Sequence, residues 1–332
     1  MPIDLDQLSS TRVPYQIYCA DGEYLIGRKN REIMLSDCYG NPIESSFYPL
    51  EDDHYEYTQT DNYWVFVFSS RVVMLVDKAN KSFEFTSLEP DKIGRSVTPL
   101  FSINDDIIFG TTAMKRSQFV RYRLPSFSRV CQTSSWDLDS ISDLICVGTK
   151  LYGVLNRSMI IHADMDSGKT LFTKFESASI GNRITPFKKG VAYPIQGLIT
   201  LLNHPTARRI QIPGMSATSL EYMDEHSGKM FFVSKTLSGS QQLGCYNIYS
   251  AELEWSIPTA FNVIDTLFLT CTVDSKPLNV WAILMEGHIA FVNPENQAII
   301  RTEKCENATS MRLTGSNLVI KRTTGSTVIK GS

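Results

Sequence analysis

The feature of this chain that most restricts its fold is a repeated pair of short apolar strands. Each pair has two runs rich in Val, Ile, Phe and Tyr joined by a short polar turn, as in NYWVFVFSS followed by RVVMLVD. A period of 38 to 47 residues between successive pairs indicates a repeat architecture. The second strands of the eight pairs begin near Arg31, Arg71, Gln118, Met159, Gly197, Leu243, His288 and Ser326.

A further strand usually precedes each pair and another follows it, so each repeat predicts four strands. Repeats of four strands, with almost no helical periodicity, predict an all-β fold, specifically a β-propeller of four-stranded blades. We expect one propeller domain over residues 1–332 with eight blades. Seven blades with an irregular terminal extension is the alternative. An open solenoid is disfavoured because it would expose two sheet edges.

The last repeat is incomplete, because the chain stops after STVIKGS without a fourth strand. The segment PIDLDQL at positions 2–8 precedes the first blade and has no other assignment. We therefore predict that residues 2–8 supply the missing outer strand of the last blade. This pairing would join the two ends of the chain and close the propeller.

Composition and charge restrict where the protein works and what it binds. The formal net charge is −3, whereas nucleic-acid and membrane-surface binders usually carry a strong basic excess. The seven cysteines are scattered with no CxxC spacing, which is typical of thiols in a reducing compartment. We find neither a signal peptide nor an apolar run long enough to span a membrane. We expect a cytoplasmic protein, or one assembled into a particle made in the cytoplasm.

One hairpin turn carries a recognisable motif, HADMDSGKTLF, at residues 162–172. It places a small residue and Asp before the turn, then Gly-Lys, then an aromatic residue. This order resembles the blade motif of the quinoprotein-like (PQQ-repeat) propellers, roughly A-x-D-x-x-T-G-K-x-x-W. WD40 propellers are less similar, since a Trp-Asp pair occurs only once. The residues that carry the resemblance are Ala163, Asp164, Gly168, Lys169 and Phe172, with partial matches at Asp77–Phe85 and at Glu254-Trp255.

The resemblance implies that bulky residues at Phe172, Phe85 and Trp255 hold neighbouring blades together. Quinone-binding members of that family also carry channel-facing acids, a calcium site and often a disulfide between adjacent cysteines. This chain has no adjacent cysteines and no acidic trio at calcium-like spacing. The resemblance therefore implies a non-catalytic member. The motif also has a purely structural explanation as a tight turn followed by a packing residue.

Motifs of catalysis are missing from the sequence. There is no GxSxG nucleophile motif, and the SGK triplets lack the leading glycine of a phosphate-binding loop. The five histidines show no spacing typical of a metal site. We therefore predict no catalytic residue, no metal and no cofactor.

The turns between the second and third strands of the repeats are rich in basic residues. In a propeller these turns lie on the face that also carries the connections between blades. They therefore predict a basic surface that docks an acidic partner protein, although turns are commonly solvated and charged in any case. The predicted partner-binding residues are Arg28, Lys29, Arg31, Arg71, Lys115, Arg116, Arg157, Lys235 and Arg322.

These observations favour a non-catalytic protein-interaction scaffold, specifically a structural subunit of a larger assembly such as a virion or another multiprotein complex. The partners are expected to be other proteins. Two alternatives stay open: an enzyme with a channel active site, hydrolytic or quinone-dependent, and a carbohydrate-binding propeller. Fold alone does not decide among them.

Overall fold

The computed structural model describes most of the chain in fifteen segments. The chain divides into two compact units: residues 1–49 with 259–332, and residues 50–258. The prediction of a single domain over 1–332 stays a prediction. The described residues are 3–47, 55–68, 72–88, 96–113, 116–137, 141–155, 159–174, 183–188, 190–195, 198–203, 206–212, 216–235, 240–259, 262–315 and 317–330.

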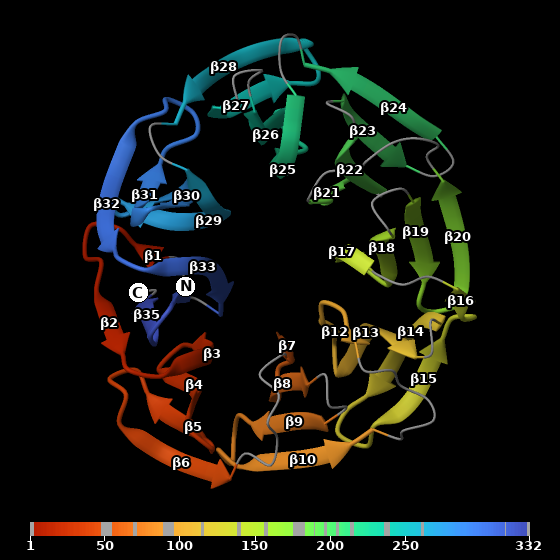
Figure 1. Cartoon of the computed structure of the whole chain (residues 1–332), viewed down its shortest axis with the longest axis vertical. Coiled ribbons are helices and arrows are strands. Elements are labelled where there is room, and N and C mark those ends of the chain that lie inside the picture. Colours follow the sequence, from red (N-terminus) through yellow and green to blue (C-terminus); the bar gives the residue numbers. More distant parts are fainter. Residues whose placement is uncertain are drawn as a thin grey trace. The chain divides into compact units, whose positions relative to one another are not determined.

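The fold is the predicted β-propeller with eight blades of four strands. The described residues form eight sheets and no helix (Figure 1). Strands that follow one another along the chain pair antiparallel within each blade, because short polar turns join successive apolar runs. The N-terminal strands of blades seven and eight are the exceptions. We number the blades one to eight along the chain.

The unit formed by residues 50–258 contains blades two to six. In Figure 1 the first strand of each blade lies on the concave side of this unit and the fourth on its outside. Blade three has broken first and fourth strands. β11 (Ser96–Val97) and β12 (Phe101–Ile103) both pair with β13 (Asp106–Ala113), whereas β15 (Ser128–Gln132) and β16 (Trp136–Asp137) both pair with β14 (Arg116–Arg123). Blade two contains β7 (Tyr55–Gln59), β8 (Tyr63–Phe68), β9 (Val72–Asp77) and β10 (Phe83–Ser87).

The other three blades of this unit are regular four-stranded sheets. Blade four contains β17 (Ile141–Val147), β18 (Lys150–Leu155), β19 (Met159–Asp164) and β20 (Lys169–Lys174). Blade five contains β21 (Thr185–Phe187), β22 (Gly190–Ile195), β23 (Leu198–Asn203) and β24 (Thr206–Gln211). Blade six contains β25 (Ser216–Asp224), β26 (Lys229–Lys235), β27 (Gln241–Asn247) and β28 (Glu252–Pro258).

The unit formed by the two ends of the chain contains blades one, seven and eight. Blade one contains β3 (Gln16–Asp21), β4 (Tyr24–Lys29), β5 (Glu32–Asp37) and β6 (Pro42–Phe47). Blade seven contains β29 (Val263–Val273), β30 (Lys276–Met285), β31 (Gly287–Val292) and β32 (Ile299–Cys305). Blade eight contains β33 (Ala308–Thr314), β34 (Asn317–Arg322) and β35 (Ser326–Ile329).

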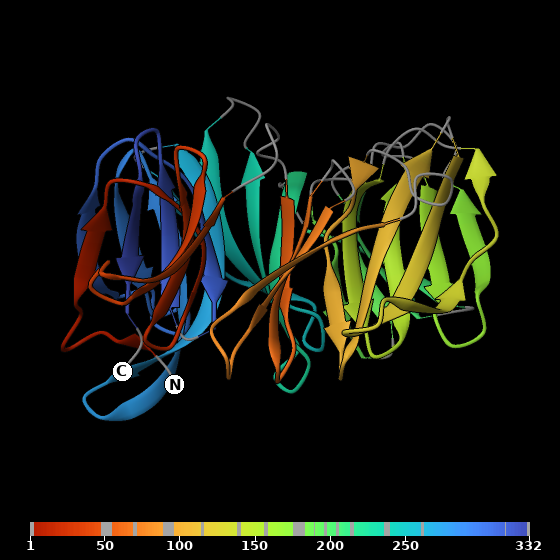
Figure 2. The same cartoon turned by 90° about the horizontal axis from the view of Figure 1, so that it is seen from below.

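The N-terminal segment contributes one strand to each of two blades. β2 (Ser10–Val13) pairs antiparallel with β35 and is the fourth strand of blade eight. The prediction that residues 2–8 do this was wrong in position. In that stretch β1 (Ile3–Asp4) instead pairs in parallel with β29 of blade seven. Figure 2 shows the β29–β30 hairpin, in light blue, projecting beyond the other strands of this unit.

The cores of both units lie between neighbouring blades. Blades seven and eight share a cluster in which Phe291 packs with Leu318 and Ile320, and the N-terminal residues Ile3 and Leu5 join it. Comparable clusters lie between blades two and three, three and four, four and five, five and six, and eight and one. Since apolar burial contributes about 25 cal/mol per Å², these shared clusters fix neighbouring blades against each other within each unit.

Candidate protein-binding surface

The β4–β5 turn of blade one is the best described of the predicted basic turns. β4 ends at Lys29 and β5 begins at Glu32, so Asn30 and Arg31 form a two-residue turn. Asn30 has φ +57°, a left-handed conformation that such turns require. Lys29 and Arg31 are exposed, and half-buried Arg28 donates from Nε to the Asn30 carbonyl at 2.7 Å. The turn is therefore braced from within and presents two cations to solvent.

The other predicted basic residues are more scattered. Arg116 is exposed at the start of β14, and Lys235 ends β26. Arg71, Lys115 and Arg157 lie outside the described residues. The structure thus brings together three members of the predicted set, Arg28, Lys29 and Arg31, in a single turn.

The prediction for Arg322 was wrong. Its side chain is buried, with 8% of the residue exposed, and its Nη1 donates to Thr327 Oγ1 at 3.0 Å. Arg322 continues the face of β34 that carries Leu318 and Ile320, because residues two apart point to the same side of a strand. It therefore braces the β34–β35 hairpin and is unavailable to a partner.

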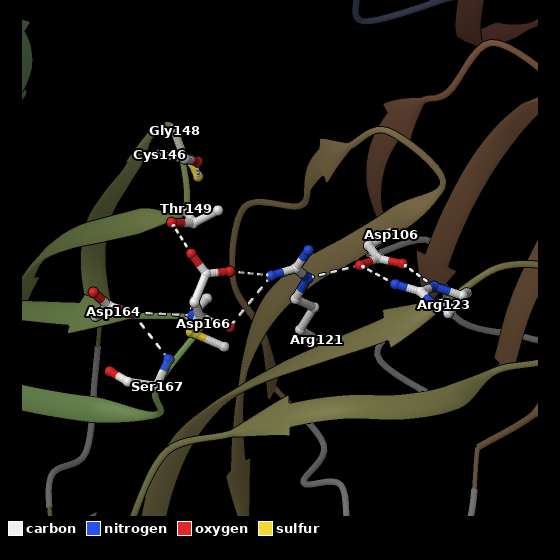
Figure 3. Close-up of polar contacts among 10 residues, drawn as sticks. Asp106, Arg121, Arg123, Cys146, Gly148, Thr149, Asp164, Asp166 and Ser167 are labelled. Atoms are coloured by element: carbon white, nitrogen blue, oxygen red, sulfur yellow. Dashed lines mark hydrogen bonds and ion pairs between the residues drawn. The ribbon is translucent and has the colours of Figure 1, made fainter.

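A charged cluster that the sequence analysis missed joins blades three and four (Figure 3). Asp106, whose side chain is only 4% exposed, accepts from Arg121 Nε at 2.8 Å and from Arg123 Nε at 3.0 Å. Arg121 Nη1 also donates across the blade boundary to Asp166 Oδ1 at 2.6 Å. Thr149 Oγ1 donates to the other oxygen of Asp166 at 2.7 Å. One guanidinium therefore links carboxylates of two blades.

The electrostatics of this cluster suit positioning and not proton transfer. Burial acts to raise the pKa of Asp106, but hydrogen bonds from Arg123 and Arg121 outweigh it and hold that pKa below its ordinary value. Burial likewise opposes the charge of Arg121, and its bonds to Asp166 and Asp106 still raise its pKa. Asp106 and Arg121 therefore both remain charged near neutral pH, so they fix the blades rather than exchange protons.

A sequence signal for this cluster does exist. Arg121 and Arg123 are two apart on β14, so both point to the same side of the sheet. Asp106 lies directly opposite Arg123 in the neighbouring strand. The link to Asp166 depends on how blade three meets blade four, and no local pattern contains that information.

The HADMDSGKTLF motif forms the turn between β19 and β20. Asp164 Oδ1 accepts the backbone N–H groups of Asp166 and Ser167, both at 3.0 Å. The Ser167 N–H is the main reason that the pKa of Asp164 lies below its ordinary value. Gly168 has φ +70°, and a Cβ there would lie 2.8 Å from the Gln132 carbonyl oxygen of blade three. Turn geometry and blade packing thus account for Asp164 and Gly168.

The aromatic residue of the motif also contacts the neighbouring blade. The rings of Phe172 and Trp136 meet edge to face with centroids 6.0 Å apart. Trp136 in turn packs 5.1 Å from Phe119 within blade three. Trp255 has a ring contact inside its own blade, with Phe231 at 6.2 Å.

Within the described segments, no three His, Cys, Asp or Glu side chains gather in a way that could hold a metal ion. Of the histidines, His54 and His204 lie outside the described residues. His162 stacks on Tyr152 with ring centroids 4.6 Å apart. No disulfide joins any of the seven cysteines, all of which lie in described segments. The described part of the chain also has no helix with the length and hydropathy needed to cross a membrane.

Comparisons with known proteins identify the fold and no family. No protein-family model matches the chain, and no curated protein matches its sequence. The structure is similar to that of BamB from Moraxella catarrhalis, with TM-score 0.66 and 13% identity over 98% of this chain and 99% of that one. It is also similar to Saccharomyces cerevisiae Sqt1, with TM-score 0.63 and 11% identity over 100% and 99% of the two chains.

A third similar structure is the computationally designed protein Ika8. The match has TM-score 0.56 and 10% identity, and it covers 85% of this chain and 98% of the designed one. At these identities the similarities define the class of protein, a β-propeller, and nothing narrower.

Proposed function

We propose that this propeller is a non-catalytic protein-interaction scaffold whose basic blade-one turn docks an acidic partner. The observation that carries the proposal is the arrangement of Arg28, Lys29 and Arg31. Arg28 bonds to the turn's own backbone, whereas Lys29 and Arg31 are exposed at its tip. A rigid turn loses little conformational entropy on binding, and paired charges steer association toward a negative surface.

We further propose that the chain is a non-catalytic member of the quinoprotein-like, WD40-like propellers. The β19–β20 turn supports this assignment, since Asp164, Gly168 and Phe172 occupy the motif positions. We infer a structural subunit of a larger assembly, a virion or another complex, made in the cytoplasm. Seven cysteines without a disulfide support a reducing compartment.

The proposal is tested with a double charge reversal of the exposed pair, Lys29→Glu with Arg31→Glu. The matched control is Lys276→Glu, an exposed lysine beside the β29–β30 turn of the same unit. Native protein is affinity-captured and co-purifying chains are identified, and the recombinant partner is then titrated directly.

We expect wild type and the Lys276→Glu variant to bind the same acidic chain, with affinity that falls as salt is raised, and the double reversal to lose it. Recovery of the protein alone, as a monomer carrying a small molecule, would overturn the scaffold proposal. That outcome would favour the channel enzyme or the carbohydrate-binding propeller.

A further inference from the structure

The outer strand of blade one, β6, is an open sheet edge beside the basic turn. Five of its six residues are exposed, and Phe47 at its end keeps 65% of its surface in solvent. β6 pairs with β5 on one side, and no described strand pairs with its other side. An edge of this kind is a template for pairing with another chain.

Most outer strands of the described blades carry positively charged side chains, which protect a sheet edge from pairing. β6 has none, and its single charge is Glu44. The outer strands β10 and β28 also lack basic residues, but their aromatic side chains Phe83, Phe85 and Trp255 are half-buried. The basic residues of the protected edges are Arg12 on β2, Arg129 on β15, Lys169 on β20, Arg208 and Arg209 on β24, and Arg301 and Lys304 on β32.

The backbone of β6 shows which residues can pair with an added strand. Asp37 N–H donates to the Asn41 carbonyl at 2.9 Å, so Asp37 directs its backbone toward the β6 side. Along a strand, the backbone N–H and C=O groups of successive residues point to opposite sides, so those of Leu35 and Ile33 also point toward β6. Their partners in β6 are Glu44 and Ser46. The N–H and C=O groups of Ser45 and Phe47 therefore point away from the blade.

The two ends of β6 differ in how open they are. At the start, Pro42 and a register shift opposite Leu35 and Ser36 interrupt a regular edge. At the other end Phe47 lies opposite Glu32, directly beside the turn that holds Lys29 and Arg31. The open half of the edge is thus continuous with the basic turn.

We propose that β6 binds an extended segment of an acidic partner protein as an additional strand, with apolar side chains over Phe47 and acidic residues at Lys29 and Arg31. The inference rests on the proposed function and specifies how the partner is bound. Main-chain hydrogen bonds to Ser45 and Phe47 supply affinity, and the apolar and charged contacts supply specificity. The charge of the basic turn selects an acidic segment over a second copy of this chain, because β6 itself offers one carboxylate.

The test uses labelled synthetic peptides in fluorescence anisotropy. The probe peptides alternate Thr with Val or Ile and carry three acidic residues at one end or at the other, since the added strand can run in either direction. One control peptide has lysines in place of the acids, and another has N-methyl groups on alternate backbone nitrogens. The protein variant is Ser45→Pro, which removes an outward N–H and leaves the bonds to β5 in place.

The matched protein control is Ser87→Pro on β10 of blade two. Asp77 N–H donates to the Ser82 carbonyl at 3.0 Å, so the same alternation directs the backbone of Ser87 outward. Both variants are first shown to keep the wild-type thermal midpoint. Ser87→Pro therefore reports any general effect of proline on an outer strand.

We expect an acidic peptide to bind wild type and Ser87→Pro alike, and Ser45→Pro to bind it about tenfold more weakly. The lysine and N-methyl peptides should be weaker by a similar factor. The inference would be overturned if Ser45→Pro bound the acidic peptide as tightly as wild type does. It would also be overturned if the N-methyl peptide bound wild type as tightly as the unmethylated peptide does. A wild-type dimer in sedimentation that Ser45→Pro converts to monomer would also overturn it, because a second copy would then occupy the edge. A different result would contradict the proposed function: retention of the captured partner by the double charge reversal Lys29→Glu with Arg31→Glu.

Discussion

Removing the Arg121 guanidinium should lower the free energy of unfolding of the unit that contains blades three and four. Arg121→Met keeps most of the aliphatic stem and deletes the guanidinium. It breaks the 2.8 Å bond to Asp106 and the 2.6 Å bond to Asp166. Asp106 is then left almost fully buried with Arg123 as its remaining charged partner.

Removing one partner of a buried ion pair costs about 3–5 kcal/mol. Arg123 still neutralises Asp106 in part, and Asp166 is 62% exposed, so water replaces its lost bond. We therefore expect the free energy of unfolding to fall by about 2–3 kcal/mol. With about 2.1 cal/mol/K of unfolding entropy per residue, a cooperative transition of 332 residues converts this loss into a decrease of about 3–4 °C in Tm.

Calorimetry and urea unfolding measure both quantities, with Arg123→Met as the control. Arg123 is 59% exposed, so its removal should cost clearly less. In an Asp106→Asn background, Arg121→Met should cost less than in wild type, because the buried charge is already gone. Since the pKa of Asp106 is depressed, its stabilisation is present above the unfolded value and is lost as the pH falls through the folded value. Equal losses for the two arginine variants would refute the reasoning.

Three further predictions concern the turns and the contacts between blades. Gly168→Ala should destabilise by about 1 kcal/mol more than Gly148→Ala, as measured by urea unfolding, because both glycines have positive φ but only Gly168 lies against a neighbouring backbone. Thr314→Val should lower the free energy of unfolding by about 2 kcal/mol, because the buried Oγ1 accepts from Ala20 N–H at 3.0 Å and donates to Ala20 O at 2.7 Å. An unchanged urea midpoint would contradict this prediction. Burial raises the pKa of the Asp143 carboxyl above its ordinary value of 3.8. As the pH rises above 3.8, the wild-type free energy of unfolding should therefore fall relative to that of Asp143→Asn. A stability difference between the two proteins that does not change with pH would contradict this prediction.

The repeat was predictable because each blade is built from local signals. Strand alternation and turn residues act over a few positions, so the eight hairpins could be read directly from the sequence. The turn after Asp164 was predictable for the same reason, since an Asp, a left-handed Gly and an aromatic residue define it locally.

The features that the sequence analysis missed depend on contacts across long distances. Residues 2–8 and residues 10–13 are both short segments near the N-terminus, and nothing local distinguishes which of them completes blade eight. Only the pairing with β35 shows that Ser10–Val13 does so. The two-residue parallel pairing of Ile3 and Asp4 has no sequence signature. Arg322 is different, because its position two residues after Ile320 predicts a buried face. Its charge was taken as a sign of exposure, and the alternation of the strand overrides that expectation.

The strap formed by the N-terminal strands also affects the order of folding. Each of blades one to seven can pair its own four strands soon after they are synthesised, because all their main pairings are short-range. β2 must wait for β35, which lies at the opposite end of the chain. Until then β2 and the outer edge of blade eight lack a partner, and the entropy of closing almost the whole chain opposes their meeting. Completion of blade eight is therefore expected to be a late step, and the interval before it is when this protein is most exposed to wrong strand pairing.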